Sequence, residues 1–111
     1  MEQEFKIRQG NSYLFVGTLK DDKGNKLQLS DYDRITILVT SPGIHCFFIR
    51  NPNDYKIEDN KIIFSLPAAE TRFFRGHVRV EAELRNGDTT IVGVYDRNVL
   101  VEENNISKLH L

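Results

Sequence analysis

The chain has 111 residues and a formal net charge of -1, with 15 Lys and Arg against 16 Asp and Glu. The two signs are scattered along the chain, so there is no basic cluster for phosphates and we expect no nucleic acid as a partner. Cys46 is the single cysteine and excludes an intrachain disulfide. A chain of this length buries about two thirds of its unfolded surface, enough for a core without a metal or a disulfide.

The N-terminal residues are polar and acidic, whereas a secretory signal needs a basic start followed by an apolar stretch. The longest apolar runs, near residues 13–16 and 91–95, are far shorter than the roughly 20 residues of a membrane helix. The sequence therefore predicts synthesis in the cytoplasm, no signal peptide and no membrane partner.

Short segments rich in Val, Ile, Phe and Thr alternate with clusters of Asp, Asn, Gly and Pro, a pattern typical of all-β proteins. In chain order, the expected strands are residues 4–8, 12–21, 34–41, 44–50, 61–66, 77–85, 89–95 and 97–102. These segments predict an all-β, antiparallel β-sandwich of about seven or eight strands. We expect one domain over residues 1–111, with 103–111 as a tail or connector.

The clearest alternation lies in residues 77–85, where apolar and charged side chains take turns, so one face is predicted to be core and the other solvent. The apolar set is Val78, Val80, Ala82 and Leu84; Ile35, Ile37 and Val39 form a second set, and Ile62, Phe64 and Leu66 a third. Asn86-Gly87 predicts a type I′ hairpin to the next strand, because both residues tolerate positive φ.

Three connections have recognisable chemistry. Residues 21–26 predict a polar turn around Gly24, residues 67–74 a short helical turn after Pro67, and residues 96–98 a bulge or bend. Asp21 begins like a calcium loop, but the Glu that would complete one is missing.

No residue pattern predicts catalysis or a metal site, so we expect no enzyme and no cofactor. His45 and Cys46 are adjacent, but neighbours on a strand point to opposite faces, and Cys46 is predicted to be a buried or half-buried structural thiol. A hydrolase using Cys46 is the least favoured class. Glu81 and Glu83 share one face with Arg79 and Arg85, which favours a solvated face with cross-strand charge pairing.

The candidate partner-binding residues are apolar side chains in loops and in the tail. Loop aromatics serve as anchors for a protein partner or as platforms for sugars, with a core position as the alternative for either Phe. The residues are Tyr32, Tyr55, Phe73, Phe74, Ile106, Leu109 and Leu111. The last three either fold back onto the sandwich or dock on a neighbouring subunit.

Residues 44–50 are expected to form an edge strand. This segment carries apolar residues on both faces, and unpaired backbone groups at a sheet edge invite pairing with another chain. We therefore expect self-association or a partner at this strand.

Two segments carry a family resemblance. Residues 5–12 with 19–30, which end in Asp-Asp-Lys-Gly-Asn-Lys-Leu-Gln-Leu-Ser, and residues 57–67 with Thr71 and 76–81 resemble the N-terminal domains of phage baseplate upper proteins. The likeness spans about residues 5–102. It implies an immunoglobulin-like sandwich that attaches a tail-tip protein to the baseplate, and it supplies no catalytic residues.

The sequence thus favours a virion structural protein, phage or prophage, that mediates protein-protein attachment. Its expected partners are other tail or baseplate proteins or itself, as a homo-oligomer. The alternative is a carbohydrate-binding or cell-surface adhesion β-sandwich module, for which the absence of Trp is unfavourable.

Overall fold

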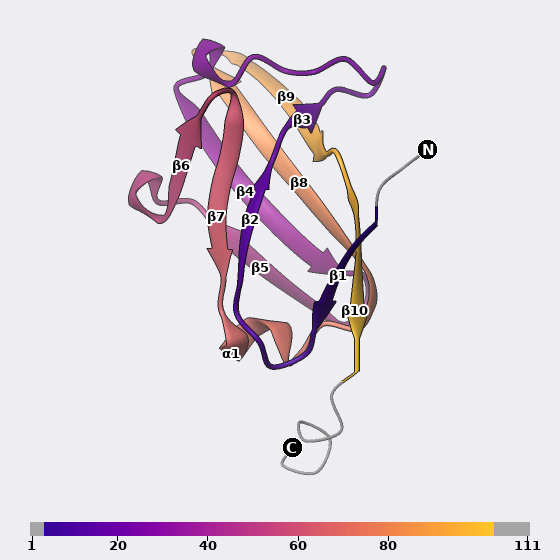
Figure 1. Cartoon of the computed structure of the whole chain (residues 1–111). Helices are drawn as coiled ribbons and strands as arrows, with labels where there is room; N and C mark the ends of the chain where they lie inside the picture. The colour runs from indigo at the N-terminus through magenta and orange to yellow at the C-terminus, as the bar shows by residue number, and fades with distance from the viewer. Residues whose placement is uncertain (1–3, 104–111) are drawn as a thin grey trace.

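The computed structural model describes residues 4–103, and its strands form two sheets (Figure 1). The larger sheet contains β1 (Glu4–Arg8), β3 (Leu19–Lys20), β4 (Arg34–Ser41), β5 (His45–Ile49), β8 (Gly76–Asn86), β9 (Thr89–Tyr95) and β10 (Asn98–Glu102). The smaller sheet contains β2 (Tyr13–Gly17), β7 (Lys61–Leu66) and β6 (Tyr55–Glu58), in that order.

The helical segments are short. They are η1 (Leu29–Asp31), η2 (Pro52–Asp54) and α1 (Ala68–Thr71), the last of which is the helical turn expected after Pro67. No helix within residues 4–103 has the length and apolar character needed to cross a membrane.

Strand β8 is the centre of the larger sheet. It pairs with β4 on one side, and on the other side with β10 near its start and with β9 along the rest. Asp96 and Arg97 form the expected bend between β9 and β10. The pairing of β1 with β10 is parallel, in contrast to the expected antiparallel pattern, while the other strand pairs described are antiparallel.

The core lies between the two sheets, and the overall arrangement is all-β and compatible with a β-sandwich. The inward sets predicted on β4, β7 and β8 are all buried in one cluster with residues from both sheets. Phe15 of the smaller sheet stacks on Phe64 at 5.1 Å between ring centroids and meets Tyr95 of the larger sheet at 5.8 Å. Aromatic rings therefore join the two layers.

The β8–β9 hairpin forms as predicted, but its turn is displaced by one residue. Asn86 pairs with Thr89, so the two loop residues are Gly87 and Asp88, and of these only Gly87 has positive φ, at 60°. A glycine at the first loop position is the requirement of a type II′ turn, and the type I′ assignment at Asn86-Gly87 was wrong.

A type I′ turn does occur in the β6–β7 hairpin. Asp59 and Asn60 have φ of 50° and 59°, and they connect Glu58 to its partner Lys61. Asn60 also accepts a hydrogen bond from the Leu29 backbone N–H at 2.7 Å and donates one to the Leu27 carbonyl at 2.9 Å. The turn therefore fixes the segment that leads into η1.

Ten strands are present in the described residues, rather than seven or eight, for two reasons. Strand β6 was not expected. The predicted strand 12–21 is divided at Thr18, because the chain passes there from the smaller sheet to the larger one.

The polar turn at residues 21–26 matches its prediction. Gly24 has φ of 84°, and the Asp21 carboxylate accepts hydrogen bonds from the backbone N–H groups of Lys23 and Asn25. These backbone hydrogen bonds, the one to Asn25 first, lower the pKa of Asp21. The carboxylate thus closes the turn.

Candidate functional site: an open sheet edge

The predicted partner-binding residues do not form one site. Tyr32 precedes β4 and Phe73 follows α1, and the start of β4 and α1 lie toward opposite ends of the sheets (Figure 1). Tyr32 and Tyr55 are both half-buried against the core. Phe73 is 46% exposed. The tail residues Ile106, Leu109 and Leu111 lie outside the described residues.

Phe74 is excluded from any binding surface because it is completely buried. Its ring lies 5.2 Å from the His45 ring, and its carbonyl accepts a hydrogen bond from Gln9 Nε2 at 2.9 Å. The alternative interpretation, a core residue that closes one end of the two sheets, is therefore the right one for Phe74.

One side of the layered structure is closed by strands that change sheets. The β1–β2 connection and Thr18 link the layers there, and Thr18 Oγ1 donates to Asp96 Oδ2 at 2.9 Å. The Tyr95 hydroxyl of the larger sheet donates to the Val16 carbonyl of β2 at 3.1 Å. The free edge of β2 is thus partly occupied.

The opposite side, which we call the open side, consists of the edge strands β5 and β6. Phe47, Tyr55 and Ile57 face inward there, because they pair with the buried residues Val39, Phe64 and Ile62. Yet Phe47 and Tyr55 are half-buried, and Ile57 is 40% exposed. Residues 4–103 therefore cover the core incompletely on this side.

Strand β5 confirms the predicted edge, since among the described strands it pairs with β4 alone. Residues 45–49 contain no charged residue and no Pro, which are the usual devices that keep sheet edges from pairing. Its outer face carries Phe48, 45% exposed, beneath the Arg50 guanidinium at 4.7 Å from the ring centroid.

Cys46 is exposed, so its prediction as a buried or half-buried thiol was wrong. The inward positions of β5 are His45, Phe47 and Ile49, which leaves Cys46 on the outer face with Phe48. His45 and Cys46 point to opposite faces, as expected.

The outer face of the larger sheet beside β5 contains a shallow groove of about 180 Å³. It is lined by Thr36, Leu38, Phe48, Glu81, Ala82, Glu83 and Val92. Glu83 pairs with Arg85 at 2.9 Å and Glu81 with Arg79 at 3.9 Å. Both ion pairs lie within β8. Neither glutamate has the expected cross-strand ion pair among the described residues, because β4 and β9 place Thr, Leu and Val opposite them.

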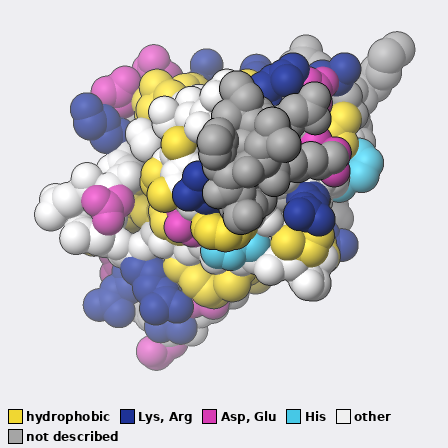
Figure 2. All heavy atoms as spheres, turned by 90° about the horizontal axis from the view of Figure 1, so that it is seen from below, with side chains coloured by type: hydrophobic (Ala, Val, Ile, Leu, Met, Phe, Trp, Pro, Cys, Tyr) yellow, Lys and Arg dark blue, Asp and Glu magenta, His cyan; other side chains and the backbone are white. Residues whose placement is uncertain are grey.

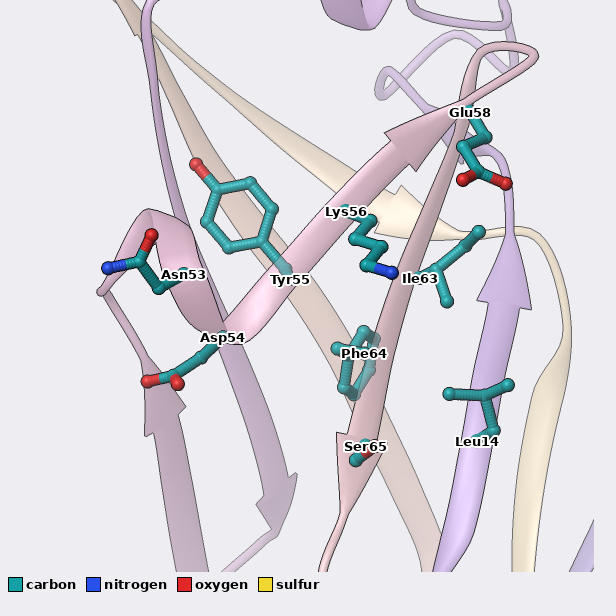
Figure 3. A pocket seen from close by; sticks show the side chains of 9 residues that line it. All are labelled: Leu14, Asn53, Asp54, Tyr55, Lys56, Glu58, Ile63, Phe64 and Ser65. Carbon is teal, nitrogen blue, oxygen red and sulfur yellow. The ribbon is translucent and has the colours of Figure 1, made fainter.

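The outer face of the smaller sheet has a larger pocket, of about 440 Å³. Figure 3 shows Leu14, Ile63 and Lys56 along adjacent strands, whereas the Tyr55 ring is directed away from them. Asn53, Asp54 and Glu58 supply polar groups at the rim. The pocket therefore offers an apolar floor with a few hydrogen-bonding groups.

The end of the molecule that carries α1 contains a contact that the sequence did not predict. His45 Nε2 lies 2.9 Å from Glu70 Oε1, and the Phe73 ring is 5.2 Å from the imidazole. Figure 2 shows hydrophobic and His side chains side by side on this end, with Lys and Arg around them.

Ser41 is buried, and its hydroxyl both donates to the Arg75 carbonyl and accepts from the Arg75 backbone N–H. These two hydrogen bonds occupy the hydroxyl.

Within the described part of the chain, no three His, Cys, Asp or Glu side chains are placed to hold a metal ion. Comparisons with protein-family models, curated proteins and solved structures found no match.

Proposed function

We propose that this chain is a non-catalytic module for protein-protein attachment, and that its partner adds a β-strand to the edge of β5. The observation that supports this most directly is the open side. There, an edge strand without Lys, Arg, Asp or Glu lies beside inward-facing apolar side chains that residues 4–103 leave partly exposed.

Strand addition would satisfy both features together. The backbone groups on the free edge of β5 would form main-chain hydrogen bonds, and alternate side chains of the added strand would cover Phe47 on one face and Phe48 on the other. An edge strand that is apolar on both faces is typical of a strand covered by a partner and not of one exposed to solvent.

We further propose that the fold is an immunoglobulin-like sandwich and that the module belongs to a phage or prophage tail or baseplate. The resemblance of residues 5–102 to baseplate upper protein N-terminal domains supports this context. The partners would then be other tail or baseplate proteins or further copies of the chain, and the protein would be made in the cytoplasm and incorporated into the virion.

Incorporation into particles tests the proposal. Particles would be produced from the genome that carries this chain, purified by density gradient, and assayed for the chain by mass spectrometry. We expect the wild-type chain to be present in the particles. The Phe48→Lys variant should be absent from them, because the substitution places a charge on the β5 edge.

Val94→Lys is the matched control, because Val94 is 47% exposed on β9 and this strand does not pair with β5. This substitution should leave incorporation unchanged. Absence of the wild-type chain from purified particles would refute the tail assignment.

A second candidate function, carbohydrate binding, is favoured by the pocket on the smaller sheet. Asn53, Asp54 and Glu58 place amide and carboxylate groups around the apolar side chains of Leu14 and Ile63 (Figure 3). Binding to a glycan array that is lost in Asp54→Ala but kept in Tyr32→Ala would support this function. If the folded wild-type chain binds no glycan on the array, the carbohydrate-binding function is refuted.

A further inference from the structure

The open side is suited to a second copy of the same chain. We infer that two copies associate about a two-fold axis through the antiparallel pairing of their β5 strands, which joins the two larger sheets into one. This inference rests on the proposed attachment through β5, and it names a second copy of the chain as the partner.

The charge pattern favours a second copy. Two like charges directly opposite each other destabilise an antiparallel pair, and the five residues of β5 contain no Lys, Arg, Asp or Glu. The next residue, Arg50, would lie opposite Ile44 of the other copy if residues 44–50 pair over their full length, so the two arginines do not meet.

Strand β6, on the same side, is compatible with this symmetry. Lys56 and Glu58 are two residues apart on its outer face and carry opposite charges, so this face of β6 adds no net charge beside the contact. With a net charge of -1 per chain, two copies also repel each other little.

Full overlap of residues 44–50 determines the register. Phe47 then faces Phe47 of the other copy on the inner face, and Cys46 faces Phe48 on the outer face. The pair buries the half-exposed Phe47 ring together with Phe48, and it brings the exposed Ile57 side chains of both copies toward the same contact. Side-chain direction is preserved, since opposite residues in an antiparallel pair share a face.

Disulfide trapping tests the register. In Phe47→Cys with Cys46→Ser, the two new cysteines would be directly opposite, with Cα atoms about 4.5–5.5 Å apart, and should oxidise to a covalent dimer. The native Cys46 residues would lie diagonally, about 7–8 Å apart, too far for a disulfide but within reach of a short bismaleimide.

Val16→Cys with Cys46→Ser is the matched control, because Val16 is an exposed residue of β2, an edge of the other sheet. It should form no disulfide-linked dimer under oxidation. A disulfide dimer of the wild-type chain, together with none in Phe47→Cys, would overturn the register.

Sedimentation velocity tests the association itself. The full chain should pass from monomer to dimer as its concentration rises, and Phe48→Lys should weaken dimerisation on the order of tenfold or more, because a two-fold contact repeats the substitution on both sides. Val94→Lys should leave the dimer unchanged.

A folded wild-type chain that stays monomeric at high concentration would overturn the second-copy inference. If that monomer is nevertheless incorporated into particles, attachment through β5 to a different protein still stands. A dimer that is absent from particles would instead refute the tail assignment and keep the two-fold contact.

Discussion

Phe73 and Phe74 are adjacent in sequence but should differ strongly in their contribution to stability. Phe74 has no exposed surface, and its ring packs on His45 at the α1 end of the core. Replacement by Ala removes a fully buried ring and leaves a cavity, so Phe74→Ala should lower the free energy of unfolding by about 3–5 kcal/mol. The hydrogen bond from Gln9 to residue 74 uses the backbone carbonyl, so it is retained in the variant.

Phe73 is the internal control. With its side chain 46% exposed, Phe73→Ala loses roughly half the transfer free energy of a buried Phe, or about 1 kcal/mol. Urea unfolding followed by circular dichroism measures both variants, and an unchanged slope with denaturant ensures that the difference reflects the folded state. Equal losses, or a larger loss for Phe73→Ala, would refute the assignment of Phe74 as the residue that closes this end of the core.

Three further predictions concern Gly17, Asn60 and Tyr95. Gly17→Ala should cost about 1–3 kcal/mol in chemical denaturation, since the added methyl overlaps the Tyr95 ring; an unchanged midpoint would contradict that packing. Asn60→Ala should lower the free energy of unfolding by about 2–4 kcal/mol, because two hydrogen bonds are lost and Ala disfavours the positive φ of this position. Asn60→Gly should recover about 1 kcal/mol of that loss, and equal values for the two variants would show that φ contributes nothing. Burial raises the pKa of Tyr95, so the unfolded chain loses this proton first and stability falls as the pH rises above about 10. Denaturation at several alkaline pH values should show a smaller fall for Tyr95→Phe, and equal falls would argue against this coupling.

The sequence predicted those parts of the fold in which one face of a strand meets the core and the other meets water. Strand β8 is the best example, because its charged and apolar residues alternate without interruption and every predicted inward residue is buried. The edge position of β5 was also predicted, but its orientation was not. Apolar residues occupy both of its faces, so the sequence does not indicate which residues face the core. Cys46 was therefore predicted to be buried or half-buried, whereas it is exposed.

The remaining misses depend on tertiary contacts. The break at Thr18 arises because the chain changes sheets, and β6 is recognisable mainly through its pairing with β7. His45 and Glu70 are 25 residues apart, and only the packing of α1 against β5 brings them together. The open side as a whole could not be predicted either, since its second edge strand, β6, was not expected.

The parallel pairing of β1 with β10 determines how the molecule responds to mechanical force. Five residue pairs join the two strands, from Glu4 opposite Asn98 to Arg8 opposite Glu102. The chain therefore enters β1 at one end of this ladder and leaves β10 at the other (Figure 1). A force that pulls these two points apart acts along the strands and loads all the ladder's hydrogen bonds together, so they must break together. Antiparallel neighbours in the same positions would open one bond at a time, whereas this arrangement resists tension by shear.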